Sequence, residues 1–151
     1  MGTRSNIFVK LNDHEYGRIY CHWDGYPTYM GKMLLKHYKT HSKCKSLVKL
    51  GDMSSLRKNI RPNKKSPHTF ENPQDNACVF YGRDRGEANV GMKIVKAESL
   101  NDIQKVKKSD WIEYYYVFDG SEWYVGGAYF DKLSNVMSLK YPDSFSNEEE
   151  D

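Results

Sequence analysis

One hairpin pattern constrains the fold of this chain more than any other stretch. Residues 111–118 (WIEYYYVF) and 122–125 (EWYV) are rich in aromatic and β-branched side chains, and Asp119-Gly120 lies between them. An Asp-Gly pair between two such runs is a strong signal for a tight turn joining antiparallel strands. The pattern therefore predicts a β-hairpin, and with it a core built at least partly on a sheet.

A second hairpin is predicted at the start of the chain. Apolar residues alternate with other residues over 7–11, turn formers follow at 12–14, and residues 16–23 form the return strand. Successive side chains of a strand point to opposite faces, so Tyr20 and His22 share one face. Two further short strands are predicted at 77–81 and 90–95.

Two helices are predicted after the first hairpin. The first begins near Thr28, and the second runs from an N-terminal cap at Ser42 to Gly51, which is placed to end it in the left-handed conformation. Each has an apolar stripe, and lysines recur at helical spacing on the other side. Two shorter helices are predicted at 99–106, capped by its first serine, and at 128–136.

These elements predict an α+β fold in a single domain that spans residues 1–145. We expect a mainly antiparallel sheet of five or six strands, with two basic helices inserted after the first hairpin. The length of 151 residues is sufficient for one core. Residues 59–76, with three prolines, are predicted to form a long loop. The acidic residues 146–151 are predicted to form a disordered tail.

Composition limits the cellular context. No run approaches the roughly 20 apolar residues that a membrane-spanning helix needs, and the N-terminal residues lack the apolar stretch of a signal peptide. The three cysteines are far apart and match neither a disulfide framework nor a metal-ligand spacing. We therefore expect a cytoplasmic protein with reduced thiols, and we predict no metal and no cofactor.

Charge is distributed unevenly along the chain. The net charge is +3, but the stretch 32–65 holds eleven Lys or Arg residues and one acid. Such a block favours an anionic partner: a nucleic acid, a nucleotide or the acidic tail of the chain itself. Lys32, Lys36 and Lys43 form the predicted anion-binding surface. A solvated helical face is the simpler interpretation, because no known nucleic-acid-binding signature accompanies these lysines.

The end of the second predicted strand is the first site candidate. His22 can act as an acid or a base near neutral pH, and the nearby Asp24 carboxylate could orient it. That pair permits a small hydrolase or nuclease. Alternatively, Trp23, Tyr26 and Pro27 form an aromatic corner that fixes the junction between strand and helix, and His22 only bonds to the backbone.

The predicted loop Tyr81–Glu87 is the second candidate. Two glycines flank alternating arginine and acid. Arg83 and Arg85 suit bidentate recognition of phosphate or carboxylate, and they can stack on bases. In the alternative, this is an exposed turn in which Asp84 and Glu87 neutralise both arginines. The stretch is not a phosphate-binding P-loop, since the glycine-rich run that ends in Lys-Ser or Lys-Thr is absent.

Four sequence blocks occur in a fixed order along the chain. They are Tyr20–Pro27 (YCHWDGYP), Gly31–Tyr38 (GKMLLKHY), Leu50–Leu56 (LGDMSSL) and Phe80–Glu87 (FYGRDRGE). Together they resemble a family of small proteins encoded mainly by bacteriophages, prophages and plasmids. That family has no settled activity, so the resemblance implies no catalytic residue. It implies a phage accessory protein in the cytoplasm of a bacterial host, acting by binding.

The preferred hypothesis is a non-enzymatic accessory protein that binds an anionic target, either a nucleotide signal or a nucleic acid, in host takeover or counter-defence. Arginines would engage phosphate, and aromatic rings would stack on a base. The predicted ligand-binding residues are His22, Asp24, Tyr26, Tyr81, Arg83, Arg85 and Glu87. Two alternatives stay open: an inhibitor whose basic helices meet an acidic surface of a host enzyme, and the small hydrolase or nuclease.

Overall fold

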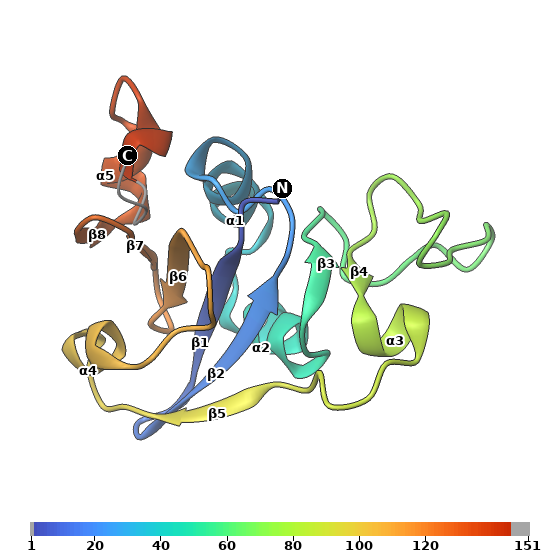
Figure 1. The fold of residues 1–151 in the computed structure, drawn as a ribbon, viewed down its shortest axis with the longest axis horizontal. Coiled ribbons are helices and arrows are strands. Elements are labelled where there is room, and N and C mark those ends of the chain that lie inside the picture. Colours follow the sequence, from blue (N-terminus) through green and yellow to red (C-terminus); the bar gives the residue numbers. More distant parts are fainter. Residues whose placement is uncertain (1, 146–151) are drawn as a thin grey trace.

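A mixed, eight-stranded sheet forms the centre of the molecule (Figure 1). This computed structural model describes residues 2–145. The strands are β1 (Ser5–Asn12), β2 (Glu15–Cys21), β3 (Met53–Ser55), β4 (Val79–Phe80), β5 (Lys93–Lys96), β6 (Tyr114–Phe118), β7 (Trp123–Gly126) and β8 (Phe130–Lys132). Their order in the sheet is β4-β3-β2-β1-β6-β7-β8, and β5 pairs with β2 outside this path.

The helices connect and cover these strands. They are a π-helix (η1, Pro27–Gly31), α1 (Lys32–His37), α2 (His41–Lys49), α3 (Tyr81–Arg85), α4 (Leu100–Lys105), α5 (Leu133–Met137) and a 3-10 helix (η2, Pro142–Phe145). The α+β class is thus confirmed. The predicted five or six strands are too few, because β3 and β8 have three residues each and leave no readable alternation in the sequence.

Both predicted hairpins are present, as β1–β2 and β6–β7. Two pairings are parallel, and they join the hairpins to the rest of the sheet. Strand β1 pairs with β6 from Ser5 opposite Tyr114, and β2 pairs with β3 through Cys21 opposite Met53. The sheet is therefore mixed, because its centre is a long-range parallel contact that no local pattern announces.

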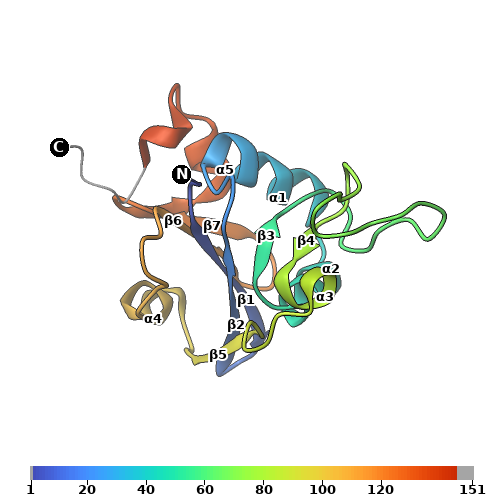
Figure 2. The same cartoon turned by 45° about the vertical axis from the view of Figure 1, so that its right-hand side comes forward.

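One side of the sheet holds the larger core. Strand residues such as Ile7, Ile19 and Phe118 face this side and pack with Leu34 of α1 and Leu47 of α2 in one buried cluster, to which α5 also contributes. Figure 2 shows α1 and α2 on one side of β1 and β2, with α4 on the other. Helices α1 and α2 therefore use their apolar stripes to close this face of the sheet.

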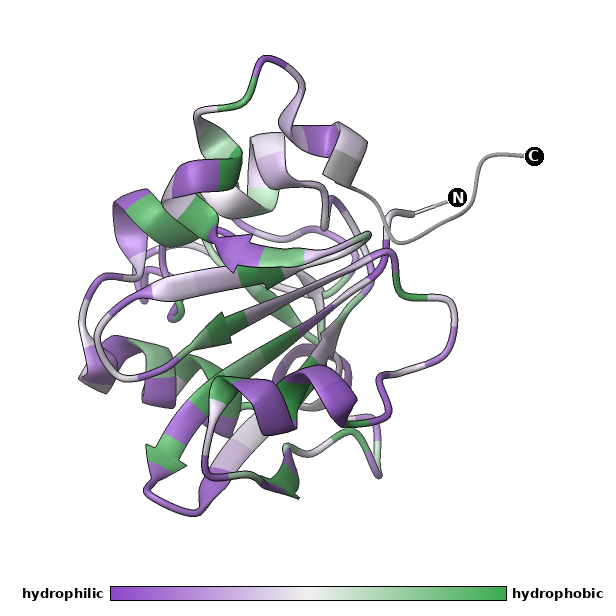
Figure 3. Ribbon diagram, turned by 90° about the vertical axis from the view of Figure 1, so that its left-hand side faces the viewer, coloured by the Kyte–Doolittle hydropathy of each residue, from purple (hydrophilic) through white to green (hydrophobic). Residues whose placement is uncertain are grey.

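The other side of the sheet is covered less fully. Of the helices within residues 2–145, α4 is the one that packs on this side, where its Ile103 contacts a small cluster with Phe8 and Val117. Apolar residues accordingly concentrate in the central strands (Figure 3). The uncovered part of this side, over β2, β3 and β4, is where the candidate site lies.

Several helix ends differ from the predicted ones by a few residues. Thr40, not Ser42, caps α2: its hydroxyl accepts a hydrogen bond from Lys43 N. Gly51 does adopt the left-handed conformation, with φ of 86°. The cap predicted at Ser99 is present, and the structure shows it as a capping box in which Ser99 and Asp102 bond reciprocally at the start of α4.

Two predicted elements are wrong in type. Residues 128–136 were expected to be one helix, but they contain β8 followed by α5. Residues 81–87 were expected to be a loop, but α3 begins directly after β4 and ends at Gly86, whose φ is 68°. The predicted acidic tail lies outside the described residues. No helix among residues 2–145 has the length and apolar character needed to cross a membrane.

Candidate ligand-binding face

Strands β2, β3 and β4 lie side by side, and each presents alternate residues to opposite faces. At one level of these strands Cys21, Met53 and Phe80 are aligned by register and are fully buried in the larger core. Their neighbours in sequence face the other side of the sheet. We call this surface the open face; its residues are Arg4, Tyr20, His22, Asp52, Tyr81, Arg85 and Glu87.

Backbone hydrogen bonds to β3 bring the two sequence-predicted turns together. His22 N donates to Met53 O (3.1 Å), and Tyr81 N donates to Asp52 O (3.2 Å). The end of β2 is therefore fixed to β3, and the start of α3 is fixed to Asp52, the residue directly before β3. Figure 1 shows this arrangement, with β3 between β2 and the segment of β4 and α3.

A hydrogen bond joins two aromatic side chains of the open face. The Tyr20 hydroxyl and His22 Nδ1 are 2.7 Å apart. Burial lowers the pKa of His22, and the Arg4 guanidinium lowers it further. Burial likewise raises the pKa of the Tyr20 phenol. Near neutral pH this hydrogen bond therefore joins a protonated phenol to an uncharged imidazole.

Aromatic rings hold Arg85 at the α3 end of the open face. Its guanidinium carbon lies 4.4 Å from the Phe70 ring centroid and 4.9 Å from that of Tyr81. Its Nη2 donates to Glu87 Oε2 at 2.5 Å, and 45% of its side chain is exposed. Such stacking orients the planar guanidinium while leaving donors accessible. Burial raises the pKa of Tyr81, so this hydroxyl also stays protonated.

Asp52 is a half-buried carboxylate among the charged and aromatic side chains of the open face. Its Oδ1 accepts the backbone N–H of Tyr20 at 2.9 Å. Burial raises the pKa of Asp52, although this hydrogen bond and the positive charges of Lys93 and Arg18 counteract the effect. Asp52 thus holds the backbone of β2 in place and reduces the positive charge of the open face.

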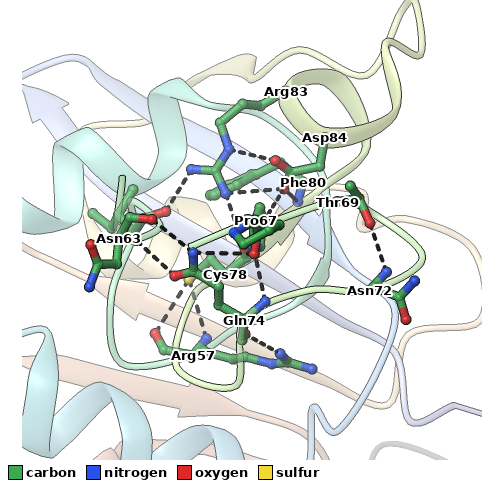
Figure 4. A network of polar contacts seen from close by, with 12 residues as sticks. Arg57, Asn63, Pro67, Thr69, Asn72, Gln74, Cys78, Phe80, Arg83 and Asp84 are labelled. Atoms are coloured by element: carbon green, nitrogen blue, oxygen red, sulfur yellow. Dashed lines mark hydrogen bonds and ion pairs between the residues drawn. The ribbon is translucent and has the colours of Figure 1, made fainter. Parts of the chain in front are cut away.

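Arg83 lies only two residues from Arg85 but points into the protein, as Figure 4 shows. Its Nη1 donates to Ile60 O (2.6 Å), its Nη2 donates to Cys78 O (2.8 Å), and its Nε donates to Asp84 Oδ1 (2.9 Å). Most of its donors are therefore used within the protein. The geometry gives Arg83 a structural role and leaves Arg85 as the accessible arginine of this helix.

The same network fastens the long loop to α3. Asp84 Oδ2 accepts the N–H of Phe80 at 2.8 Å and lies 3.3 Å from Nε2 of the buried His68, whose Nδ1 accepts from Gln74 N. Burial tends to raise the pKa of Asp84, but the hydrogen bonds from Arg83 and Phe80 lower it below its usual value. Asp84 therefore stays ionised at the centre of the network.

Asp24 and Tyr26 lie apart from the open face. Asp24 is exposed in a left-handed turn, with φ of 56°. Burial raises the pKa of the Tyr26 phenol, and the neighbouring Asp24 carboxylate raises it further. Within the described residues His22 hydrogen-bonds to Tyr20 rather than to Asp24. The pair needed by the hydrolase hypothesis is thus not joined by a hydrogen bond.

The three predicted anion-binding lysines belong to the helices on the opposite side of the sheet. Lys43 Nζ donates to His37 O (2.6 Å) and to Lys58 O (3.1 Å), so it caps the end of α1. Lys32 and Lys36 are exposed and line a hollow of about 240 Å³ on α1. They form a separate surface. Residues 2–145 contain no group of three or more His, Cys, Asp or Glu side chains suited to a metal ion.

Sequence reasoning missed some residues of the open face. Tyr20 was recognised as sharing a face with His22, and the hairpin register, which pairs Asn6 with Tyr20, was a signal that Arg4 lies near both. No sequence pattern connects Phe70 with Arg85. Comparisons with protein-family models, curated proteins and solved structures found no match.

Proposed function

We propose that this protein binds an anionic ligand that carries a nucleobase, and that it does so on the open face without chemical turnover. The observation that carries this proposal is Arg85, whose guanidinium is stacked on Phe70 and Tyr81 and remains half-exposed. A guanidinium oriented in this way has lost part of its conformational freedom before a ligand arrives. It therefore binds phosphate at a smaller entropic cost.

The neighbouring groups suit the same ligand. Tyr20 and Tyr81 keep their hydroxyl protons near neutral pH, so both can donate to phosphate oxygens. Arg4 lies close enough to lower the pKa of His22 and adds a second positive charge. Trp23, 43% exposed and packed edge-on to His22 at 4.7 Å between ring centroids, offers a surface on which a base can stack.

In the context implied by the four sequence blocks, such a protein would capture a nucleotide signal or a nucleic acid inside an infected bacterial cell. Phage origin and this cytoplasmic role remain part of the proposal. The hydrolase alternative has less support, because His22 is engaged by Tyr20 and Cys21 points to the opposite, fully buried face. A binding role needs no free histidine and no nucleophile on the open face.

Isothermal titration of the purified protein with nucleoside triphosphates and with short single-stranded oligonucleotides tests the proposal. Arg85→Ala removes one charge-assisted contact and should weaken binding about 10- to 100-fold. The matched control is Lys32→Ala, which removes an exposed cation from the opposite side of the sheet and should leave affinity unchanged. A folded Arg85→Ala variant with wild-type affinity, or a wild-type protein that binds neither probe class, would refute the proposal.

A further inference from the structure

A basic hollow adjoins the open face. It encloses about 420 Å³ between β2 and the segment that follows α4, and it is lined by Arg18, Lys107, Lys108, Ser109 and Asp110. Three of these five side chains are cationic and one is acidic. A hollow of this composition favours a phosphate group over a neutral or cationic ligand.

The sheet geometry makes this hollow continuous with the open face. Arg18, Tyr20 and His22 lie on the same face of β2, and neighbouring members of the row are about 7 Å apart. Asn6, which pairs with Tyr20, is fully buried. It exchanges two hydrogen bonds with Ser109, each 2.9 Å long. These bonds therefore fix the hollow directly beside Tyr20.

Two of the cations are placed to meet a ligand. Arg18 Nη1 donates to Lys107 O at 2.8 Å, which holds the guanidinium at the rim, and Lys107 itself is exposed. Lys108 is committed to the protein: its Nζ donates to the carbonyl oxygens of Ile103 and Gln104, both at 2.8 Å. Burial lowers the pKa of Lys108 to about 8. Arg18 and Lys107 are therefore the residues to test.

An exposed tryptophan follows the hollow in sequence. Trp111 is 78% exposed and has φ of 65°, a backbone conformation that a bulky residue rarely adopts. Glu113 N donates to Arg4 O at 2.9 Å, which ties this segment to the same end of the sheet as the open face. So exposed an indole contributes little to the core, but it provides an aromatic surface on the residue directly after Asp110, which lines the hollow.

From this continuity we infer that the ligand is a single-stranded nucleic acid several nucleotides long, with one phosphate near Arg85, another in the Arg18–Lys107 hollow and a base on Trp111. This inference rests on the proposed function and makes it more specific. A groove of cations interleaved with aromatic rings is how proteins bind single strands without reading their sequence. A mononucleotide would occupy only one part of this surface.

Fluorescence anisotropy with labelled oligo-dT and oligo-U of one to about eight nucleotides tests the inference. For wild type we expect affinity to increase at least about tenfold with length as the second phosphate site and Trp111 are reached. Arg18→Gln should remove most of this gain and reduce the slope of log affinity against log salt by about 1. Trp111→Ala should weaken oligonucleotide binding by about tenfold.

Neither Arg18→Gln nor Trp111→Ala should change the affinity for a mononucleotide. The control variant Lys39→Gln removes an exposed cation on the opposite side of the sheet and should bind every probe as wild type does. Circular dichroism checks folding, and Lys107→Gln provides the same test if Arg18→Gln unfolds. Affinity that is independent of length, or equal for single strands and duplexes, overturns the inference while the nucleotide-binding proposal survives. Absence of binding to every probe overturns both. The dT and U series distinguish DNA from RNA.

Discussion

The two faces of strands β2, β3 and β4 are built from residues that alternate in the sequence, yet they differ in burial and in polarity. Cys21, Met53 and Phe80 are fully buried among apolar neighbours, whereas Tyr20 and His22, on the other face, are half-exposed and joined by a hydrogen bond. One face provides stability and the other offers polar and aromatic groups to a ligand. Substitutions one position apart should therefore separate folding from binding.

Helix α3 repeats this division over a single turn. Arg83 donates to two backbone carbonyls and to Asp84 inside the protein, whereas Arg85 lies outside on two aromatic rings. The two side chains are chemically identical. Their different environments show that position relative to the long loop, rather than residue type, decides which arginine remains available to a ligand.

The largest effect is expected on the buried face. Phe80→Ala removes a fully buried ring and leaves a cavity in the larger core, which should reduce the free energy of unfolding by about 3–5 kcal/mol. Urea denaturation followed by tryptophan fluorescence measures this loss. Tyr81 follows Phe80 in sequence and lies on the open face, so Tyr81→Phe should reduce the free energy of unfolding by less than about 1 kcal/mol. Equal losses would show that the two faces are not separate.

A smaller effect on stability should distinguish the two arginines of α3. Arg83→Ala leaves Asp84 Oδ1 and two carbonyl groups without their partner and should reduce the free energy of unfolding by about 2–3 kcal/mol. Arg85→Ala breaks an exposed ion pair and should change stability by less than about 0.5 kcal/mol. Thermal denaturation of both variants measures the difference. If Arg83→Ala were as stable as wild type but defective in binding, the assigned roles would be reversed.

The smallest effect concerns pH and His22. Burial and Arg4 lower the pKa of His22, so the unfolded chain takes up a proton more readily, and the ligand-free protein should lose stability as pH falls through about 6.5. A bound phosphate favours the protonated imidazole. Ligand affinity should therefore rise by roughly 3- to 10-fold between about pH 7.5 and 5.5.

Titrations at several pH values measure this change, and His22→Gln should make affinity nearly independent of pH in that window. A wild-type affinity that falls as pH decreases would place the phosphate away from His22. It would then favour the Arg85 end of the open face as the first anion site.

Short sequence patterns predicted the elements that depend on neighbouring residues, namely the two hairpins and the capped helix α4. Asp119-Gly120 and the alternating first strands identified both hairpins, and the Ser99 cap identified α4. The parallel pairing of β1 with β6 was not predictable in this way, because it depends on packing between distant segments. In α3, Gly82 and Gly86 suggested a loop. Only Gly86 has the left-handed conformation, which ends the helix.

The candidate site was predictable in part for the same reason. The structure brings the segments of His22, Tyr81 and Arg85 together at β3, and their role in binding stays a prediction. The inward direction of Arg83 depends on Ile60 and Cys78, whose carbonyl groups are positioned by the folded loop. No property of Arg83 itself distinguishes it from Arg85.

The pairing of Ser5 with Tyr114 also has a consequence for synthesis of the protein on the ribosome. At 5–20 residues per second, translation takes on the order of ten seconds to proceed from one partner to the other. During that time β2 can pair with β3 and β5, which are made before β6, but the edge of β1 that will bind β6 is unpaired. The nascent chain therefore carries an apolar strand edge that invites chaperones or aggregation until its last third emerges.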